Sequence, residues 1–177
     1  MPEAVLYTVG HGRRSVAELA AVVGDAGVSR LVDVRRFPGS RRSPHLSRAT
    51  LERQLPTFGI AYEWCEELGG RRSRVAGSRH SAWSHDAFAG YADHMDTPGF
   101  RRALDRLLEQ LPLAVMCAET LWWRCHRRLI ADAAVLAGAD VVHLLEVGRR
   151  QAHSLHPGVR PDDEGRPVYD GGSFWST

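Results

Sequence analysis

The densest group of chemically reactive side chains lies between residues 113 and 127. An apolar run ends at Cys117, Glu119 follows two residues later, and the next segment opens with Cys125, His126 and Arg127. Thiols, a carboxylate and an imidazole can act as nucleophiles and general bases, and a guanidinium can hold an anion. We therefore predict a site here, with Cys117, Glu119, Cys125 and His126 as candidate catalytic residues.

Each of these residues also has a structural interpretation. Cysteine is among the most buried residue types, so Cys117 on an apolar strand fits simple core packing. Cys125 and His126 lie four residues before two apolar residues of the next predicted helix, which puts them on its buried face in the first turn. The unpaired N–H groups there would lower the pKa of a thiol. Glu119 could pair with an arginine or cap the helix as readily as it could act as a base.

Further candidates for ligand binding follow other predicted strands or lie in loops. His11 stands between two glycines, and Asp33 and Arg35 end a buried strand, where a structural ion pair is the simpler interpretation. Of two adjacent tryptophans only one can point inward, so we expect one of them to form a wall of the pocket. The predicted ligand contacts are His11, Asp33, Arg35, Arg42, Gly69, Gly70, Trp122 and Arg127.

The elements that position these residues alternate between strand and helix patterns. Short apolar runs predict strands over 5–9, 31–34, 60–64, 113–117 and 141–145, the first of them buried. A capping box of Ser15 and Glu18 predicts a helix that ends near residue 27. Further helices are predicted to start at Ser47, at Ser84 and at Thr97, and the last predicted helix covers 124–137.

This alternation predicts an α/β fold, with a mainly parallel sheet between helices on both faces, in three layers. Right-handed crossovers place the loops that follow parallel strands at one edge of the sheet. The candidates at residues 11, 33, 35 and 117–119 can therefore meet in one crevice.

Length and composition indicate an ordinary globular protein. The 177 residues correspond to a single domain, which we place over 1–147, with a polar Gly- and Pro-rich extension over 148–177 that packs on the surface. The net charge of +2 is too small to indicate nucleic-acid binding by itself. All cationic side chains are arginines, which genome composition explains most simply. They nevertheless cluster in two loops that suit an anionic ligand, at positions 35, 36, 41, 42 and 48 and at 71, 72, 74 and 79.

The three cysteines and the lack of an export signal or a membrane-spanning apolar run indicate a cytoplasmic protein with free thiols. Cys65 has no partner in the sequence, and we interpret it as structural.

The same residues carry a resemblance to the domain of unknown function 488 family. The matching segments are Thr8–His11, Asp33–Arg35 with Pro38 and Ser40, Leu68–Gly70, Met116–Glu119 and Cys125–Arg127. The resemblance implies a cytoplasmic prokaryotic domain whose activity is not established. Two features depart from the family pattern: Gly12, where the family usually has serine, and the pair Trp122–Trp123. The layout of strand, Cys117 and Arg-bearing helix start is also similar to that of rhodaneses and cysteine phosphatases, but without their Gly-rich loop.

Three functions are consistent with these residues. The first is a hydrolase or transferase that acts on an anionic, phosphate-bearing substrate, such as a nucleotide or nucleic acid, with a cysteine or Glu119 in the chemistry. The second is a non-catalytic module that binds nucleic acid or a phosphorylated partner. The third and least favoured is a metal site, because the Cys-x7-Cys-His spacing fits no standard zinc module. We expect no cofactor, no metal and no membrane association, and the sequence does not indicate an oligomeric state.

Overall fold

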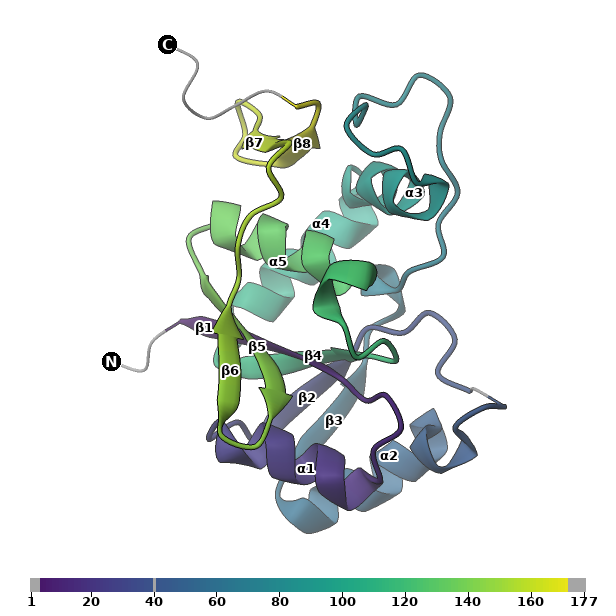
Figure 1. The fold of residues 1–177 in the computed structure, drawn as a ribbon, viewed down its shortest axis with the longest axis vertical. Coiled ribbons are helices and arrows are strands. Elements are labelled where there is room, and N and C mark those ends of the chain that lie inside the picture. Colours follow the sequence, from purple (N-terminus) through teal and green to yellow (C-terminus); the bar gives the residue numbers. More distant parts are fainter. Residues whose placement is uncertain (1–3, 40, 172–177) are drawn as a thin grey trace.

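A six-stranded sheet with the order β3-β2-β4-β1-β5-β6 forms the centre of the molecule (Figure 1). The computed structural model describes residues 4–39 and 41–171. Five strands run parallel to their neighbours, and the sixth lies antiparallel to β5 at the edge. The mainly parallel sheet is therefore confirmed. The strands are β1 (Val5–Gly10), β2 (Arg30–Asp33), β3 (Ala61–Trp64), β4 (Leu113–Cys117), β5 (Asp140–Glu146) and β6 (Arg149–Ala152).

Helices cover both faces of this sheet, as predicted. One face carries α1 (Val16–Asp25) and α2 (Arg48–Gln54). The opposite face carries α3 (Asp86–Met95), α4 (Pro98–Leu108) and α5 (Arg127–Leu136) (Figure 1). Each face buries its own apolar cluster against the strands. After β1 the chain turns to α1 on one face of the sheet, and after the adjacent β4 it turns to α5 on the other face. Connections that leave neighbouring strands in opposite directions open a crevice at the carboxyl ends of those strands.

The capping signals in the sequence predicted most helix starts correctly. The capping box of Ser15 and Glu18 is present, and the side chains of Ser47 and Thr97 accept N–H bonds at the starts of α2 and α4. The third helix start was predicted one residue early: the cap of α3 is His85, whose ring nitrogen accepts from the Ala87 N–H.

The last helix begins later than predicted. A 3-10 turn, η4 (Trp122–Arg124), and an extended residue, Cys125, precede α5, which starts at Arg127 rather than at Arg124. His126 occupies the cap position without a side-chain capping bond. Cys125 and His126 therefore stand just before the helix and not within its first turn.

The C-terminal segment adds an edge strand and a short hairpin. The polar strand β6 was not predicted. Val168 and Tyr169 belong to β8 (Pro167–Tyr169), which pairs with β7 (Val159–Pro161). The buried Tyr169 hydroxyl donates to Asp132 Oδ2 in α5 at 2.7 Å. This segment thus contributes buried side chains as well as surface.

Ser40 and residues 172–177 lie outside the described residues. Within the described part of the chain, no helix is both long and apolar enough to cross a membrane.

Candidate functional site

The carboxyl ends of β1, β2 and β4 come together at one edge of the sheet. Gly10 lies opposite Cys117 in the register of β1 and β4, and Asp33 lies opposite Met116. The loops that follow continue this contact, because the His11 N–H donates to the Cys117 carbonyl at 2.9 Å. A Cβ on Gly10 would stand 2.0 Å from the Glu119 carbonyl oxygen, so only glycine permits this approach.

The same loops are joined at Gly12, one of the departures from the family pattern. Its backbone is left-handed, with φ +52°, and its N–H donates to the Ala118 carbonyl at 3.1 Å. The Thr120 hydroxyl oxygen lies 2.5 Å from the position of a Cβ at residue 12. A hydroxyl from the neighbouring loop therefore occupies the space in which a serine side chain would begin.

A cavity of about 570 Å³ opens at this edge of the sheet. Six of the predicted site residues line it: Arg35, Gly70, Cys117, Glu119, Cys125 and His126. The residues that prediction missed are mostly basic or aromatic and come from the loops: Arg36, Phe37, Arg71, His85, Ala87, Phe88, Ala118, Trp123 and Arg124.

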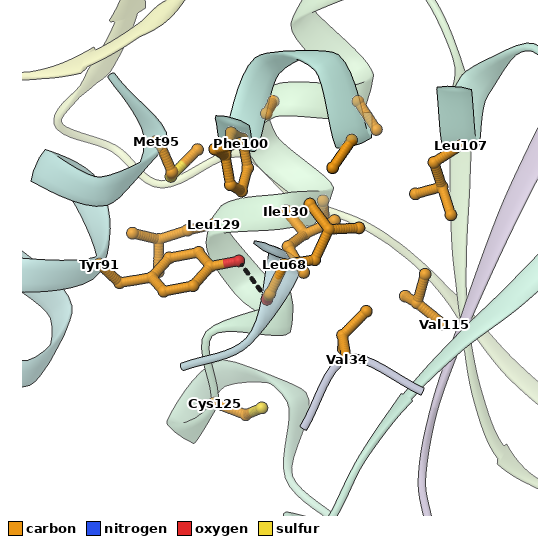
Figure 2. Close-up of a cluster of buried hydrophobic side chains, with 14 of the residues drawn as sticks. Val34, Leu68, Tyr91, Met95, Phe100, Leu107, Val115, Cys125, Leu129 and Ile130 are labelled. Atoms are coloured by element: carbon orange, nitrogen blue, oxygen red, sulfur yellow. Dashed lines mark hydrogen bonds between the residues drawn. The ribbon is translucent and has the colours of Figure 1, made fainter. Parts of the chain in front are cut away.

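Two thiols meet at this cavity. Cys117 Sγ lies 2.6 Å from Cys125 Sγ, and only 2% and 7% of the two residues are exposed. Both are free cysteines. Figure 2 shows Cys125 at the margin of the buried apolar cluster beneath α5, so one side of the residue belongs to the core and the other lines the cavity.

The two thiols ionise as a coupled pair. Burial raises the pKa of Cys125, but the hydrogen bond from Cys117 and the charge and N–H of Arg127 outweigh burial and lower this pKa from 9.0 to about 7. Burial and the neighbouring Cys125 raise the pKa of Cys117 well above its ordinary value. The pair can therefore carry one negative charge near neutral pH, on Cys125, with the Cys117 thiol as its hydrogen-bond donor.

Arg127 supplies the positive charge behind the thiols. It is 1% exposed, and its Nε donates to Cys117 Sγ at 3.0 Å. Its other side-chain donors reach the Thr8 hydroxyl at 3.0 Å and the carbonyls of Glu119 and Thr120. In the described part of the chain no carboxylate pairs with this guanidinium. A buried charge is costly unless it is paired, so a thiolate is its natural counter-ion here.

A buried chain of hydrogen bonds continues from Arg127 into the protein. Thr8 Oγ1 bonds His143 Nδ1 at 2.6 Å, His143 Nε2 bonds His153 Nδ1 at 2.9 Å, and His153 Nε2 bonds Asp132 Oδ1 at 2.7 Å. Because the carboxylate accepts at one end and the guanidinium donates at the other, each ring donates through Nε2 and accepts through Nδ1. Burial, His153 and Arg127 lower the pKa of His143 to about 3, which keeps this ring neutral. The network holds Arg127 in one orientation.

His126 presents its unprotonated nitrogen to Cys125. Its Nε2 donates to the Val34 carbonyl at 2.8 Å, which leaves Nδ1 as an acceptor 3.4 Å from Cys125 Sγ. Burial lowers the pKa of this imidazole, so the neutral ring is favoured. A Cβ on Gly70 would lie 2.9 Å from His126 Nδ1, and this glycine therefore leaves room for the ring.

Asp33 and Arg35 form a buried ion pair, the structural interpretation of this motif. Arg35 donates to both carboxylate oxygens, with Nη2 at 2.6 Å from Oδ2, and Tyr62 donates to the same oxygen at 2.5 Å. Arg35 nevertheless reaches the cavity wall, and its Nη1 lies 3.3 Å from His11 Nε2. His11 and Asp33 are buried behind this wall and support it rather than line it.

Glu119 stabilises its own loop at the edge of the cavity. Its Oε1 accepts the Leu121 N–H at 3.0 Å and so braces the loop, while the residue is exposed and lines the cavity.

Besides His11 and Asp33, four predicted ligand contacts lie outside the cavity lining, among them Arg127, which is buried behind the two thiols. Trp122 is buried and stacks on His143, with ring centroids 4.1 Å apart, and the wall tryptophan is instead its neighbour Trp123. Prediction chose the wrong member of the pair because the partner of Trp122 comes from β5, far away in sequence. Arg42 lies in an exposed loop outside the lining. Gly69 packs against the Arg36 backbone, where a Cβ would stand 2.7 Å from Cα.

The electrostatic character of the cavity is positive. Arg35, Arg36, Arg71 and Arg124 line it, against a single acidic lining residue, Glu119, among the described residues, and only Arg35 of the four is paired with a buried carboxylate. Arg36 and Arg71 belong to the two Arg-rich loops noted in the sequence, which was the signal that could have identified them.

Within the described residues, no group of three or more His, Cys, Asp or Glu side chains is arranged to hold a metal ion.

Comparison with known proteins gives one match. A family model described as a domain of unknown function, DUF488, matches residues 15–134, more than half of the chain. No curated protein and no solved structure matches the chain.

Proposed function

This chain belongs to the DUF488 family, a domain of unknown function, and we propose that its cavity binds an anionic, phosphate-bearing ligand that carries a planar ring, as nucleotides do. We further propose that Cys125 acts on this ligand as a nucleophile, in a hydrolase or transferase reaction. The observation that carries the proposal is the contact of a buried thiol pair with Arg127 at the floor of an Arg-lined cavity.

The arginines of the wall support an anionic ligand. Arg71 and Arg124 are exposed at the cavity, Arg36 is half-buried, and Arg35 is ion-paired with Asp33. Guanidinium groups bind phosphate through paired N–H donors, which gives orientation as well as affinity.

The aromatic side chains support a planar group on that ligand. Phe37 and Trp123 are large side chains exposed at the cavity, and the partly buried Phe88 adds to its wall. Arg36 and Arg71 lie over the Phe37 ring at 5.3 and 5.8 Å. Aromatic faces of this kind stack on nucleobases without sequence preference.

The floor supports thiol chemistry. Cys125 is the thiol whose ionisation the surroundings favour, and the Nδ1 atom of His126 can accept its proton when the thiol is protonated. Arg127 stabilises the resulting thiolate, and the Glu119 carboxylate at the opening can take or return a proton of the ligand. The free thiols fit the reducing conditions of the cytoplasm.

Calorimetric titration of the purified protein with AMP and with adenosine tests the ligand class. We expect AMP to bind and adenosine to bind at least tenfold more weakly, because only AMP carries the phosphate that the arginines would hold, and the AMP affinity should fall as salt increases. The double variant Arg71→Gln/Arg124→Gln should lose AMP binding, and Arg102→Gln, an exposed position on α4, should keep it.

Equal binding of AMP and adenosine, or AMP binding that is insensitive to the double variant, would contradict the phosphate site. AMP binding to a protein whose Cys125 is unreactive would favour the non-catalytic binding module instead.

A further inference from the structure

The sulfur atoms of Cys117 and Cys125 lie close enough for a bond between them to form with little movement. A disulfide has an S–S distance of about 2.05 Å, so the 2.6 Å between Cys117 and Cys125 leaves about half an ångström to close. Eight positions separate the two residues, and they lie on two different segments, the end of β4 and the residue after η4.

We propose that Cys117 and Cys125 form a redox-active dithiol that reduces small anionic disulfides, in which Cys125 attacks the disulfide and Cys117 resolves the resulting mixed disulfide. This activity goes beyond the proposed function, because it requires the thiol pair and the basic cavity but no phosphate group on the substrate.

The surroundings of the two thiols assign their roles. Cys125 is the more exposed of the pair. Cys117 lies deeper and is held by Arg127 Nε at 3.0 Å. A substrate in the cavity therefore meets Cys125 first, and Cys117 waits in contact with it.

The charge of the pair supports the same order of events. While Cys125 is anionic, its charge helps to raise the pKa of Cys117. When Cys125 enters a mixed disulfide this charge disappears, and Arg127, still in contact with Cys117, now favours the Cys117 thiolate. The second thiol thus becomes nucleophilic at the step that needs it.

The exchange balances in two steps. The Cys125 thiolate attacks one sulfur of a disulfide RSSR, which forms Cys125–S–S–R and releases one thiolate RS⁻. Cys117 loses its proton to solvent or to the released thiolate and attacks the Cys125 sulfur. The Cys117–Cys125 disulfide forms and the second RS⁻ leaves. The protein dithiol supplies both electrons, and the disulfide RSSR is reduced to two thiols.

The cavity selects the charge of the substrate. Three arginines that line it, Arg36, Arg71 and Arg124, face a single lining carboxylate within the described residues. A low-molecular-weight disulfide with carboxylate groups, such as glutathione disulfide, matches this charge, whereas a cationic disulfide such as cystamine does not.

Incubation with glutathione disulfide, followed by intact-mass and peptide analysis, tests the proposal. The wild-type protein should lose two hydrogen atoms, release two molecules of glutathione and show a Cys117–Cys125 cross-link. Cys117→Ser should instead retain one glutathione on Cys125, and Cys125→Ser should react at least tenfold more slowly than the wild type. Cys65→Ser is the matched control and should behave as the wild type, because Cys65 does not line the cavity. Cystamine should react more slowly than glutathione disulfide.

Several results would overturn the proposal. These are retention of glutathione by the wild type, a cross-link that involves Cys65, equal rates with the two disulfides, or no oxidation of a protein whose Cys125 is readily alkylated. Circular dichroism checks the fold of each variant, and Cys117→Ala replaces Cys117→Ser if the latter is unfolded. AMP binding by the reduced protein reports separately on the proposed function, so the two can fail independently.

Discussion

Replacement of Arg127 by methionine tests how the fold controls the reactivity of Cys125. Methionine keeps an unbranched apolar stem about as long as that of arginine up to Nε, but removes the only charge in hydrogen-bond contact with the thiol pair among the described residues. The donors to Cys117, Thr8 and the Glu119 carbonyl disappear together. The thiol pair then loses the counter-ion that makes its first deprotonation favourable.

The expected size of the effect follows from the pKa of Cys125. With a pKa of about 7, half of the Cys125 thiols are ionised at pH 7. A return to the ordinary value of 9.0 leaves about 1% ionised, so the alkylation rate at pH 7 should fall about 50-fold. The shift of about two pKa units corresponds to about 3 kcal/mol of interaction with the thiolate, to which the Cys117 hydrogen bond and Arg127 both contribute. Lysine at this position keeps the charge but not the fork of donors, and Arg127→Lys should lie between the two.

The assay is the rate of iodoacetamide alkylation at Cys125, followed by peptide mass spectrometry from pH 5 to 10. An electrostatic effect shifts the pH at which the alkylation rate of Cys125 is half of its maximum. A simple loss of packing would instead expose the thiol and accelerate its reaction. Arg102→Gln is the control for loss of a distant charge. A folded Arg127→Met protein with an unchanged midpoint would refute the assignment of Arg127 as the counter-ion.

Three further predictions concern the surroundings of the site. Asp33→Asn leaves a buried guanidinium without its carboxylate, and the free energy of unfolding measured with urea should fall by about 3–5 kcal/mol. Gly70→Ala should displace the His126 ring and change the rate of Cys125 alkylation, while Gly99→Ala, with nothing within 4 Å of its Cβ, should not; equal rates in both variants would contradict this role of Gly70. The pKa of His143 is lowered in the folded state, so the unfolded chain binds a proton first as the pH falls below about 6.5, and stability should decline from there down to about pH 3. Urea titrations at several pH values give the slope of the free energy of unfolding against pH. In this range His143→Phe should reduce that slope by up to about 1.4 kcal/mol per pH unit.

The sequence was sufficient for the elements whose signals are local. Short apolar runs predicted the five parallel strands, and the capping box predicted the start of α1, because both signals depend on neighbouring residues. The strand β6 has no such signal: its four side chains are exposed, three of them are polar, and only pairing with β5 makes it a strand. The delayed start of α5 has a similar cause, since the turn at Trp122 brings its ring onto His143 of a distant strand.

The site residues that come directly after strands were predictable, and those in long loops were not. Cys117, Glu119 and Arg35 reach the cavity because parallel strands end at one edge. The contributions of Arg71, His85 and Trp123 depend on how long loops fold back, for which the sequence has no periodic signal. The buried network behind Arg127 was also missed, because its members are far apart in the chain and meet only in the folded core.

The most direct test of the central claim measures the rate at which iodoacetamide alkylates Cys125 in the wild-type protein at pH 7, with and without AMP. The alkylation rate of Cys65 is the internal reference. Burial raises the pKa of Cys65 to about 11, so Cys125 should react much faster than Cys65. AMP at ten times its dissociation constant should slow Cys125 about tenfold, and the same concentration of adenosine should have little effect. Equal reactivity of the two cysteines, or a Cys125 that AMP leaves unprotected, would contradict a thiolate within an anion-binding cavity.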